Sequence, residues 1–363
     1  MKIINIVGAR PNFIKIAPIL RQMRKSSVIE PILLHTGQHY DIEMSKRFFE
    51  ELDIPSPDIS LEVGSDTHAR QVARIMERFD DVCDTRKPDG ILVVGDVNST
   101  MACSLVAAKK GIKIIHVEAG IRSFDREMPE EINRMVTDAI ADLLLPPSKD
   151  AVDNLLREGH SPGKIHLVGN IMIDTLMDSQ SRIRQSTILD QMGIEEKKYA
   201  LVTLHRPSNV DNSSDFKRIL LALAKIGQQL PVVFPVHPRT RKILDDPELK
   251  AITSSMNRLI LCDPLGYFDF GRLVAGCRMV ITDSGGIQEE STVYGIPCIT
   301  IRENTERPIT VLEGTNELAG TDTGKIVGFA SQILEGKWKT GKIPDLWDGH
   351  TAERIIACIE KEM

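Results

Sequence analysis

Short apolar runs alternate with longer amphipathic stretches through the first half of the chain, a rhythm typical of βαβ units. We expect strands at Ile3–Val7, Ile29–His35, Gly90–Val94, Ile112–Val117, Leu143–Pro146 and Ile165–Leu167. We expect helices at Ile14–Arg24, Ile42–Leu52, Ala69–Cys83 and Thr100–Lys109. This alternation predicts a parallel sheet that is covered by helices on both faces.

The same rhythm restarts in the second half. Strands are expected at Tyr199–Thr203, Val232–Pro235, Leu259–Leu261, Met279–Thr282 and Pro297–Ile301, and helices at Phe216–Gln228, Phe268–Ala275, Gln288–Tyr294 and Ala352–Glu360. The pattern predicts an α/β protein of two Rossmann-like domains that face each other across a cleft. We expect one domain over 1–170, joined by a terminal helix within 346–363, and the other over 171–345. Ligands of such sheets bind beyond the carboxyl ends of the strands.

Length and composition narrow the class of protein. The 363 residues suit two domains, and the net charge of −6 argues against nucleic acid as a partner. The six cysteines form no C-x-x-C pair, so we expect buried thiols in a reducing compartment and no metal site. The N-terminal apolar run is too short for a signal peptide, and no run approaches the ~18 residues of a membrane span. A cytoplasmic protein without a membrane partner is therefore expected.

The turn after the first strand reads Gly8-Ala9-Arg10-Pro11, and Lys15 follows in the next helix. Free N–H groups at a helix start and two cations suit a diphosphate. The turn lacks the pattern G-x-G-x-x-G, which counts against a nicotinamide cofactor. An ordinary turn with a solvated arginine is the alternative.

Three acidic residues are candidates for acid–base chemistry. Asp96 follows the strand Gly90–Val94, and Glu118 follows Ile112–Val117, so both are expected at one sheet edge. Neighbouring carboxylates push their pKa values apart, which suits an acid and a base. The plainer interpretations are a helix N-cap for Asp96 and an ion pair with Arg122 for Glu118. Glu130 opens a helix after Pro129, where a surface pair with Arg134 is the plainer interpretation.

In the second half, His205 follows a strand and could bind or protonate a phosphate oxygen. A hydrogen-bonded turn histidine is the alternative, and His237 has weaker support. The most specific pattern is Ser284-Gly285-Gly286 between a strand and a helix, which predicts a phosphate cradle. Glu290, farther along that helix, could reach a ribose diol, and Arg307 could add a cation.

These motifs, in this order, resemble the non-hydrolysing UDP-N-acetylglucosamine 2-epimerases. The resemblance rests on G-x-R-P…K, G-D…T, V-E-A-G-x-R, P-E-E-x-N-R, H-R and D-S-G-G-x-Q-E-E. It implies a GT-B-like fold and the interconversion of UDP-GlcNAc and UDP-ManNAc, which feeds the synthesis of surface polysaccharides. It also implies a UDP-sugar as substrate, a homodimer, and neither a metal nor a nicotinamide.

The resemblance further implies roles for single residues. Proton removal from C2 and departure of UDP would give a 2-acetamidoglucal, with Asp96, Glu118 and Glu130 as the catalytic carboxylates and His205 assisting the diphosphate. The positions that match nucleotide-binding residues are Arg10, Lys15, Ser284, Gly285, Gly286, Glu290 and Arg307. Arg134 and His237 complete the expected substrate-binding set.

Some positions depart from the common pattern of that family. Ala9 and Asn12 stand where many members have Thr and Glu, Val97 replaces a common Thr, and the segment Thr36–Met44 is longer than usual. These changes weaken the expectation of allosteric activation by substrate. They are similar to enzymes that epimerise UDP-2,3-diacetamido-2,3-dideoxy-glucuronate, which stays open as the substrate. A GT-B glycosyltransferase, a hydrolysing epimerase and a non-catalytic sugar-nucleotide sensor also stay open as functions.

Overall fold

The computed structural model describes residues 1–37 and 50–363, without the side chains of Arg10, Pro238 and Arg239. Most of the expected helix Ile42–Leu52 and most of the segment Thr36–Met44 lie outside this part of the chain. The described residues form two compact units. Unit 1 comprises Met1–Asp178 and Asp345–Met363, and unit 2 comprises Ser179–Pro344.

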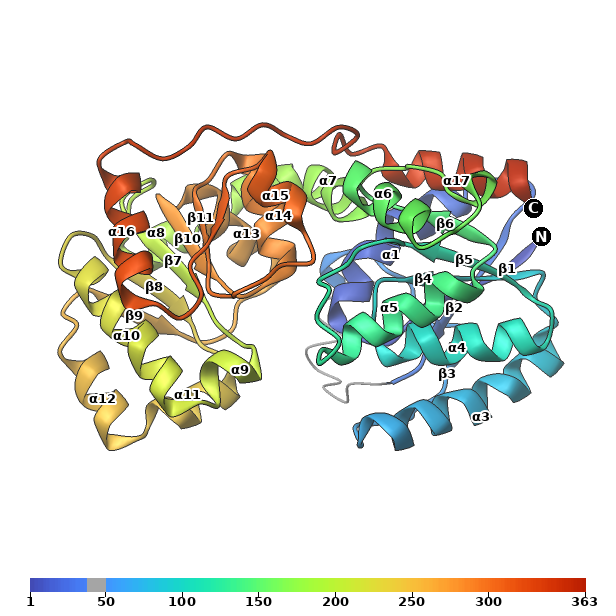
Figure 1. The fold of residues 1–363 in the computed structure, drawn as a ribbon, viewed down its shortest axis with the longest axis horizontal. Coiled ribbons are helices and arrows are strands. Elements are labelled where there is room, and N and C mark those ends of the chain that lie inside the picture. Colours follow the sequence, from blue (N-terminus) through green and yellow to red (C-terminus); the bar gives the residue numbers. More distant parts are fainter. Residues whose placement is uncertain (38–49) are drawn as a thin grey trace. The chain divides into compact units, whose positions relative to one another are not determined.

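Unit 1 is built on a parallel six-stranded sheet in the order β3-β2-β1-β4-β5-β6 (Figure 1). Its strands are β1 (Lys2–Val7), β2 (Glu30–His35), β3 (Ile59–Ser60), β4 (Gly90–Val94), β5 (Lys113–Val117) and β6 (Leu143–Leu145). Five were expected, and the two-residue β3 was missed because it is too short to carry a pattern. The expected strand Ile165–Leu167 is wrong, since Ile165 makes only an isolated bridge to Leu144.

Unit 2 repeats the architecture with the order β12-β11-β10-β7-β8-β9. Its strands are β7 (Ala200–Thr203), β8 (Val232–Pro235), β9 (Leu259–Cys262), β10 (Met279–Thr282), β11 (Cys298–Thr300) and β12 (Asn316–Leu318). All of these strands pair in parallel. The predicted fold class, α/β with two Rossmann-like sheets, is confirmed.

Helices cover both faces of each sheet. Unit 1 contains α1 (Arg10–Met23), α3 (His68–Arg86), α4 (Asn98–Lys109), α5 (Pro129–Ile140), α6 (Lys149–Arg157) and α17 (Thr351–Glu362). Unit 2 contains α8 (Ile188–Met192), α9 (Pro207–Val210), α10 (Ser213–Gly227), α11 (Pro238–Leu244), α12 (Pro247–Ser254), α13 (Tyr267–Gly276), α14 (Gly285–Tyr294), α15 (Pro308–Leu312) and α16 (Thr323–Leu334). Helix α7 (Ile171–Gln185) runs through the boundary of the two units.

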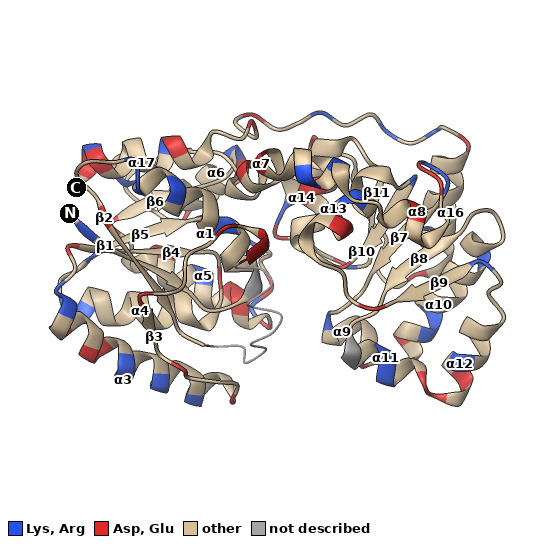
Figure 2. Cartoon of the chain, turned by 180° about the vertical axis from the view of Figure 1, so that it is seen from behind, with Lys and Arg blue, Asp and Glu red and all other residues tan. Residues whose placement is uncertain are grey.

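The core of unit 1 explains why its strands are almost uninterrupted apolar runs. Ile4 and Ile6 of β1 pack with Phe79 of α3 and Ala102 of α4, while Ile3 and Val7 are equally buried. In a strand buried on both faces, the side chains that point to either face are apolar. In Figure 1, α3, α4 and α5 lie on one face of this sheet and α1 and α17 on the other. Figure 2 shows the charged residues mainly on helices and loops, with the strands mostly tan.

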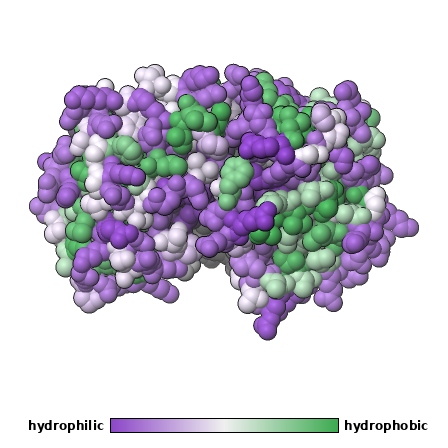
Figure 3. All heavy atoms as spheres, in the orientation of Figure 1, coloured by the Kyte–Doolittle hydropathy of each residue, from purple (hydrophilic) through white to green (hydrophobic). Residues whose placement is uncertain are grey.

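Exposed apolar side chains occur on unit 1. Ile132 of α5 is exposed, and Figure 3 shows apolar side chains gathered over α4 and α5. Among the described residues, no helix combines the length and the apolar character needed to span a membrane.

The chain crosses between units inside α7, after Asp178, and not at the expected position between 170 and 171. The first half of α7 belongs to unit 1 because Ile171, Ile173 and Leu176 are buried there. Asp174, on the same stretch, accepts hydrogen bonds from the backbone N–H groups of Thr351 (3.1 Å) and Ala352 (2.7 Å). A side chain from α7 thus caps the N-terminus of α17, the last helix of the chain.

This cap leads to a prediction about stability. Asp174→Ala leaves two buried N–H groups without their acceptor and should lower the free energy of unfolding by about 2 kcal/mol. Urea denaturation monitored by circular dichroism measures the change. Asp178→Ala is the matched control, because Asp178 pairs with Arg21 on the exposed side of the same helix and should change stability by less than about 0.5 kcal/mol. Equal effects of the two variants would contradict the capping role.

Candidate active site

Two sharp turns end neighbouring strands of unit 1 and carry two of the expected catalytic acids. β4 and β5 pair up to Val94 and Val117, and Gly95 N–H then donates to the Val117 carbonyl oxygen (3.1 Å). Gly95 has φ +72° and Glu118 has φ +69°, both in the left-handed region. Such a conformation is uncommon for a residue with a side chain and often marks a functional position. The structure brings Asp96 and Glu118 to one edge of the sheet.

Glu118 is held by Lys15 of α1, with 2.5 Å between Oε2 and Nζ. Both side chains are buried. A Cβ atom on Gly95 would lie 3.3 Å from Lys15 Nζ and 3.4 Å from Glu118 Oε2, so a side chain there would crowd the pair. The alternative interpretation of Glu118 as an ion-pair partner of Arg122 does not hold, because Arg122 pairs with Asp138 (2.6 Å) and Glu158 (2.7 Å).

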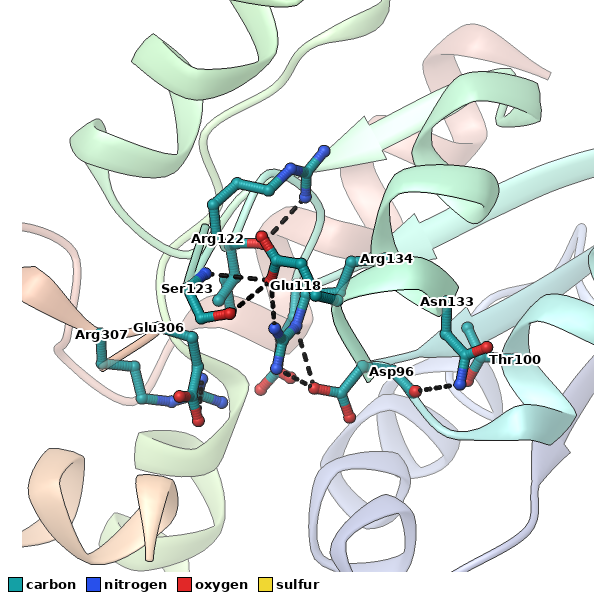
Figure 4. Close-up of polar contacts among 12 residues, drawn as sticks. Asp96, Thr100, Glu118, Arg122, Ser123, Asn133, Arg134, Glu306 and Arg307 are labelled. Carbon is teal, nitrogen blue, oxygen red and sulfur yellow. Dashed lines mark hydrogen bonds and ion pairs between the residues drawn. The ribbon is translucent and has the colours of Figure 1, made fainter. Parts of the chain in front are cut away.

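Asp96 is held by Arg134 of α5, as Figure 4 shows. Arg134 Nη2 and Nε lie 2.5 Å and 3.0 Å from Asp96 Oδ2, and the Asp96 side chain remains 27% exposed. Arg134 also pairs with Glu131 (2.6 Å). Arg134 thus pairs with Asp96 and Glu131, and the plainer interpretation of a surface pair with Glu130 does not hold. Arg134 and Glu131 lie on the buried face of α5, whereas Glu130 at the start of the helix is half-exposed.

Glu131 is a residue of this site that sequence reasoning missed. Its carboxylate accepts hydrogen bonds from the backbone N–H groups of Ser123 (3.0 Å) and Phe124 (2.9 Å) and from the Ser123 hydroxyl (2.9 Å). It thereby ties the loop after Glu118 to the helix that holds Asp96. The signal in the sequence was the polar stripe Glu131, Arg134 and Asp138, which falls on one helical face.

A buried charge network lies beneath the two turns. His116 of β5 contacts Asp138 Oδ1 through Nδ1 (2.6 Å) and the Gly95 carbonyl oxygen through Nε2 (3.0 Å). Asp138 Oδ2 also accepts from Gly120 N–H (3.0 Å). Burial alone would raise the pKa of Asp138, but the charges and hydrogen bonds of His116 and Arg122 outweigh it and hold that pKa below its usual value. Asp138 was also missed from the sequence.

The Gly8–Ala9 turn after β1 is closed by its own helix. Asn12 Oδ1 accepts from the N–H groups of Gly8 (3.1 Å) and Ala9 (3.0 Å), and Asn12 Nδ2 donates to the Val94 carbonyl oxygen (2.9 Å). Asn12 thus joins the first turn to the end of β4. A Cβ atom on Gly8 would lie 2.2 Å from Ser99 Oγ, so this position requires glycine. The side chain of Arg10 lies outside the described part of the chain.

In unit 2, His205 follows β7 and is oriented by Asp283 at the end of β10. Their Nδ1 and Oδ1 atoms are 2.8 Å apart, with His205 54% exposed and Asp283 fully buried. Asp283 also accepts from the N–H of Arg206 (2.9 Å) and from Asn209 Nδ2 (3.1 Å). Burial would raise the pKa of Asp283, but these contacts and the His205 charge hold it below its usual value. Because Nδ1 faces Asp283, Nε2 is the nitrogen through which His205 can reach a ligand. His237 follows β8 and is half-buried.

The Ser284-Gly285-Gly286 segment follows β10, with Ser284 as the N-cap of α14 and the two glycines as its first residues. A Cβ atom on Gly285 would lie 2.8 Å from Glu306 Oε1, so the helix start is packed against the segment that carries Arg307. Arg307 Nε pairs with Glu289 Oε1 (2.8 Å), and Arg302 pairs with Glu306 (2.6 Å). Helix N–H groups beside arginines can hold an anion.

Glu290 lies one residue beyond Glu289 in α14 and is buried. Burial and, to a lesser extent, the negative charge of Glu289 raise the pKa of Glu290 to about 8. Its carboxyl group is thus mainly protonated at neutral pH. Within residues 1–37 and 50–363, no three His, Cys, Asp or Glu side chains converge as they would around a metal ion.

Comparison with known proteins places this architecture in a family. The family model for UDP-N-acetylglucosamine 2-epimerase matches residues 21–360. A UDP-N-acetylglucosamine 2-epimerase homolog of Methanococcus maripaludis is 44% identical over 92% of both chains. The UDP-2,3-diacetamido-2,3-dideoxy-D-glucuronate 2-epimerase of Pseudomonas aeruginosa is 40% identical, also over 92% of both. The crystal structure of Methanocaldococcus jannaschii UDP-GlcNAc 2-epimerase in complex with UDP-GlcNAc and UDP superimposes with a TM-score of 0.91 at 38% identity, covering 99% of this chain and 100% of that one.

The two parallel sheets with strand-end acids and a Ser-Gly-Gly helix start are those of a GT-B-like α/β enzyme. The chain belongs to the UDP-N-acetylglucosamine 2-epimerase family, whose activity is that of an isomerase. The family resemblance seen in the sequence is confirmed.

The raised pKa of Glu290 gives a prediction about pH and stability. Between the unfolded value of 4.5 and the folded value of about 8, the folded protein binds more protons than the unfolded chain, so its stability falls as pH rises. Glu290→Gln removes this dependence. Relative to wild type, the variant should gain stability steadily from pH 5 to pH 8, by at most about 1.4 kcal/mol per pH unit.

Urea denaturation at pH 5, 6, 7 and 8 checks this expectation. Glu335→Gln serves as the control, because the Glu335 side chain is exposed at the end of α16 and its substitution should change stability by less than about 0.5 kcal/mol. A constant difference between Glu290→Gln and wild type across this range would show that Glu290 is ionised throughout.

Proposed function

We propose that this protein is a non-hydrolysing UDP-N-acetylglucosamine 2-epimerase that interconverts UDP-GlcNAc and UDP-ManNAc. The observation that carries the proposal is the pair of strand-end carboxylates at adjoining turns, each held by its own cation. Glu118 faces Lys15 and Asp96 faces Arg134, both at 2.5 Å. An enzyme that removes and returns a proton on opposite faces of C2 needs two such groups in different surroundings.

The proposed reaction proceeds by elimination and re-addition. A carboxylate takes the C2 proton, the C1–O bond to UDP breaks, and a 2-acetamidoglucal forms with a double bond between C1 and C2. UDP then adds back to C1 while C2 receives a proton on the other face, so that atoms and charges balance. Asp96, Glu118 and Glu130 are the proposed acid–base residues.

In the proposed elimination, the largest change in charge occurs on UDP, whose diphosphate gains negative charge as the C1–O bond breaks. We assign the diphosphate to His205, Ser284, Gly285, Gly286 and Arg307, together with Arg10 and Lys15. Asp283 supports this role of His205, because its buried carboxylate on Nδ1 orients the ring and leaves Nε2 to contact an anion. Glu290 is the proposed ribose contact, and Arg134 and His237 complete the proposed substrate-binding set.

UDP-2,3-diacetamido-2,3-dideoxy-glucuronate is the second candidate substrate. The Pseudomonas aeruginosa enzyme named for that sugar is 40% identical to this chain, as is the UDP-N-acetylglucosamine 2-epimerase of Methanocaldococcus jannaschii. Sequence identity therefore does not distinguish between the two candidate substrates, and the activity assay must include both sugars.

Proton NMR in deuterated water tests the reaction directly. With UDP-GlcNAc, we expect deuterium at C2 and accumulation of UDP-ManNAc, without free sugar. Free ManNAc and UDP would instead indicate a hydrolysing enzyme. Exchange only with the diacetamido-uronate would transfer the proposal to that substrate, and no exchange with either sugar would refute an epimerase.

The acid–base assignment predicts the effect of isosteric substitutions. Asp96→Asn and Glu118→Gln should each lower kcat by about 10³-fold or more, because neither amide can accept the proton. The Kd for UDP, measured by calorimetry, should stay within about threefold of wild type. Asp153→Asn, on the exposed face of α6, is the control and should keep full activity. Strong activity in either site variant would remove that residue from the catalytic set.

A further inference from the structure

His116 is a fully buried histidine with a hydrogen-bond acceptor at each ring nitrogen. Nδ1 lies 2.6 Å from Asp138 Oδ1, and Nε2 lies 3.0 Å from the carbonyl oxygen of Gly95. A neutral imidazole carries one N–H and could satisfy only one of them. The doubly protonated ring donates to both, and an acceptor left bare in a buried site would be costly.

The surroundings of His116 compensate its charge. Asp138 comes from α5, and Arg122, from the loop after β5, lies 2.6 Å from the other oxygen of Asp138. Glu158, after α6, closes the network with 2.8 Å and 2.7 Å contacts to Arg122. The four charges alternate in sign and sum to zero when the histidine is protonated. The strands on either side place Val93 and Leu144 next to His116, so the sheet adds no further charge. Lys15 and Glu118 are the charged pair beyond Gly95.

The contacts of this network end on the two turns of the candidate active site. The Gly95 carbonyl that His116 binds immediately precedes Asp96 in the chain. The Gly120 N–H that Asp138 binds (3.0 Å) is two residues after Glu118. Gly95, Glu118 and Gly120 all have left-handed φ angles, of +72°, +69° and +78°. For Glu118 this backbone conformation is unfavourable and persists only where surrounding contacts enforce it.

We propose that His116 donates a hydrogen bond from each ring nitrogen and that, with Asp138, it forms a positioning pair that fixes the turns of Asp96 and Glu118. The pair touches no reacting atom and acts through the backbone of those turns. The kinetic part of this inference rests on the proposed function, whereas the protonation state of His116 can be measured without any substrate.

Nitrogen-15 NMR of histidine-labelled wild-type protein tests the protonation state. We expect one of the nine histidines to show two protonated ring nitrogens at pH 7, because both nitrogens of His116 face acceptors. The signal is assigned by its absence from His116→Gln or, if that variant does not fold, by its shift in Asp138→Asn. An unprotonated ring nitrogen of His116 at pH 7 would overturn the proposal.

Kinetics test the positioning role. His116→Gln and Asp138→Asn should each lower kcat by about 10- to 100-fold, because small displacements of catalytic groups are costly. The Kd for UDP should remain within about threefold of wild type.

Asp174→Asn is the matched control, since Asp174 is also a buried carboxylate of unit 1 that accepts two backbone N–H groups. It should lower stability but keep kcat within about twofold. Wild-type kcat in His116→Gln would refute the positioning role. Equal losses of kcat in His116→Gln, Asp138→Asn and Asp174→Asn would show that the losses come from lower stability and not from positioning. A wild-type enzyme that does not epimerise would refute the proposed function and leave the NMR result standing.

Discussion

The backbone of Glu118 is the constraint on which the rest of unit 1 depends. A buried strand delivers an acidic residue in a left-handed conformation, with its carboxylate against Lys15. Both the conformation and the burial of charge are unfavourable by themselves. Around this residue the chain places a glycine on the neighbouring turn, a lysine from α1 and the anchored Gly120. Each contact removes one way for the turn to relax.

Charge compensation is the common principle of both units. In unit 2, Asp283 supports His205 and Glu289 pairs with Arg307, so that each of these groups assigned to the nucleotide has a buried partner of opposite sign. Glu290 is the exception, because burial and the like charge of Glu289 raise its pKa and its carboxyl group is neutralised by a proton instead. Burying a charge is tolerable only with a partner or a proton.

The sequence predicted well those features that depend on residues close together in the chain, such as the bounds of strands. β4, β8 and β10 have the bounds that their apolar runs predicted, since a strand buried on both faces excludes polar residues over its whole length. The placement of Asp96 and Glu118 at one edge followed from parallel strand order. The partners of these residues could not be predicted, because they depend on contacts across long sequence distances. Lys15 is 103 residues from Glu118, and Arg134 is 38 residues from Asp96.

The helical spacing of Glu130 and Arg134, which suggested a surface pair as the plainer interpretation, shows why local rules fail at such a site. Spacing along a helix favours a partner four residues away only when both side chains lie in solvent and nothing else competes. Arg134 is buried, and a buried guanidinium binds the carboxylates that reach it with good geometry, here Asp96 and Glu131. Helix α5 therefore presents Glu131, Arg134 and Asp138 on its inner face, where an ordinary amphipathic helix would present apolar side chains. Buried charge contributes little to stability but is effective in fixing geometry. The charged inner face of α5 therefore fits the proposed role of this helix in holding the strand-end acids.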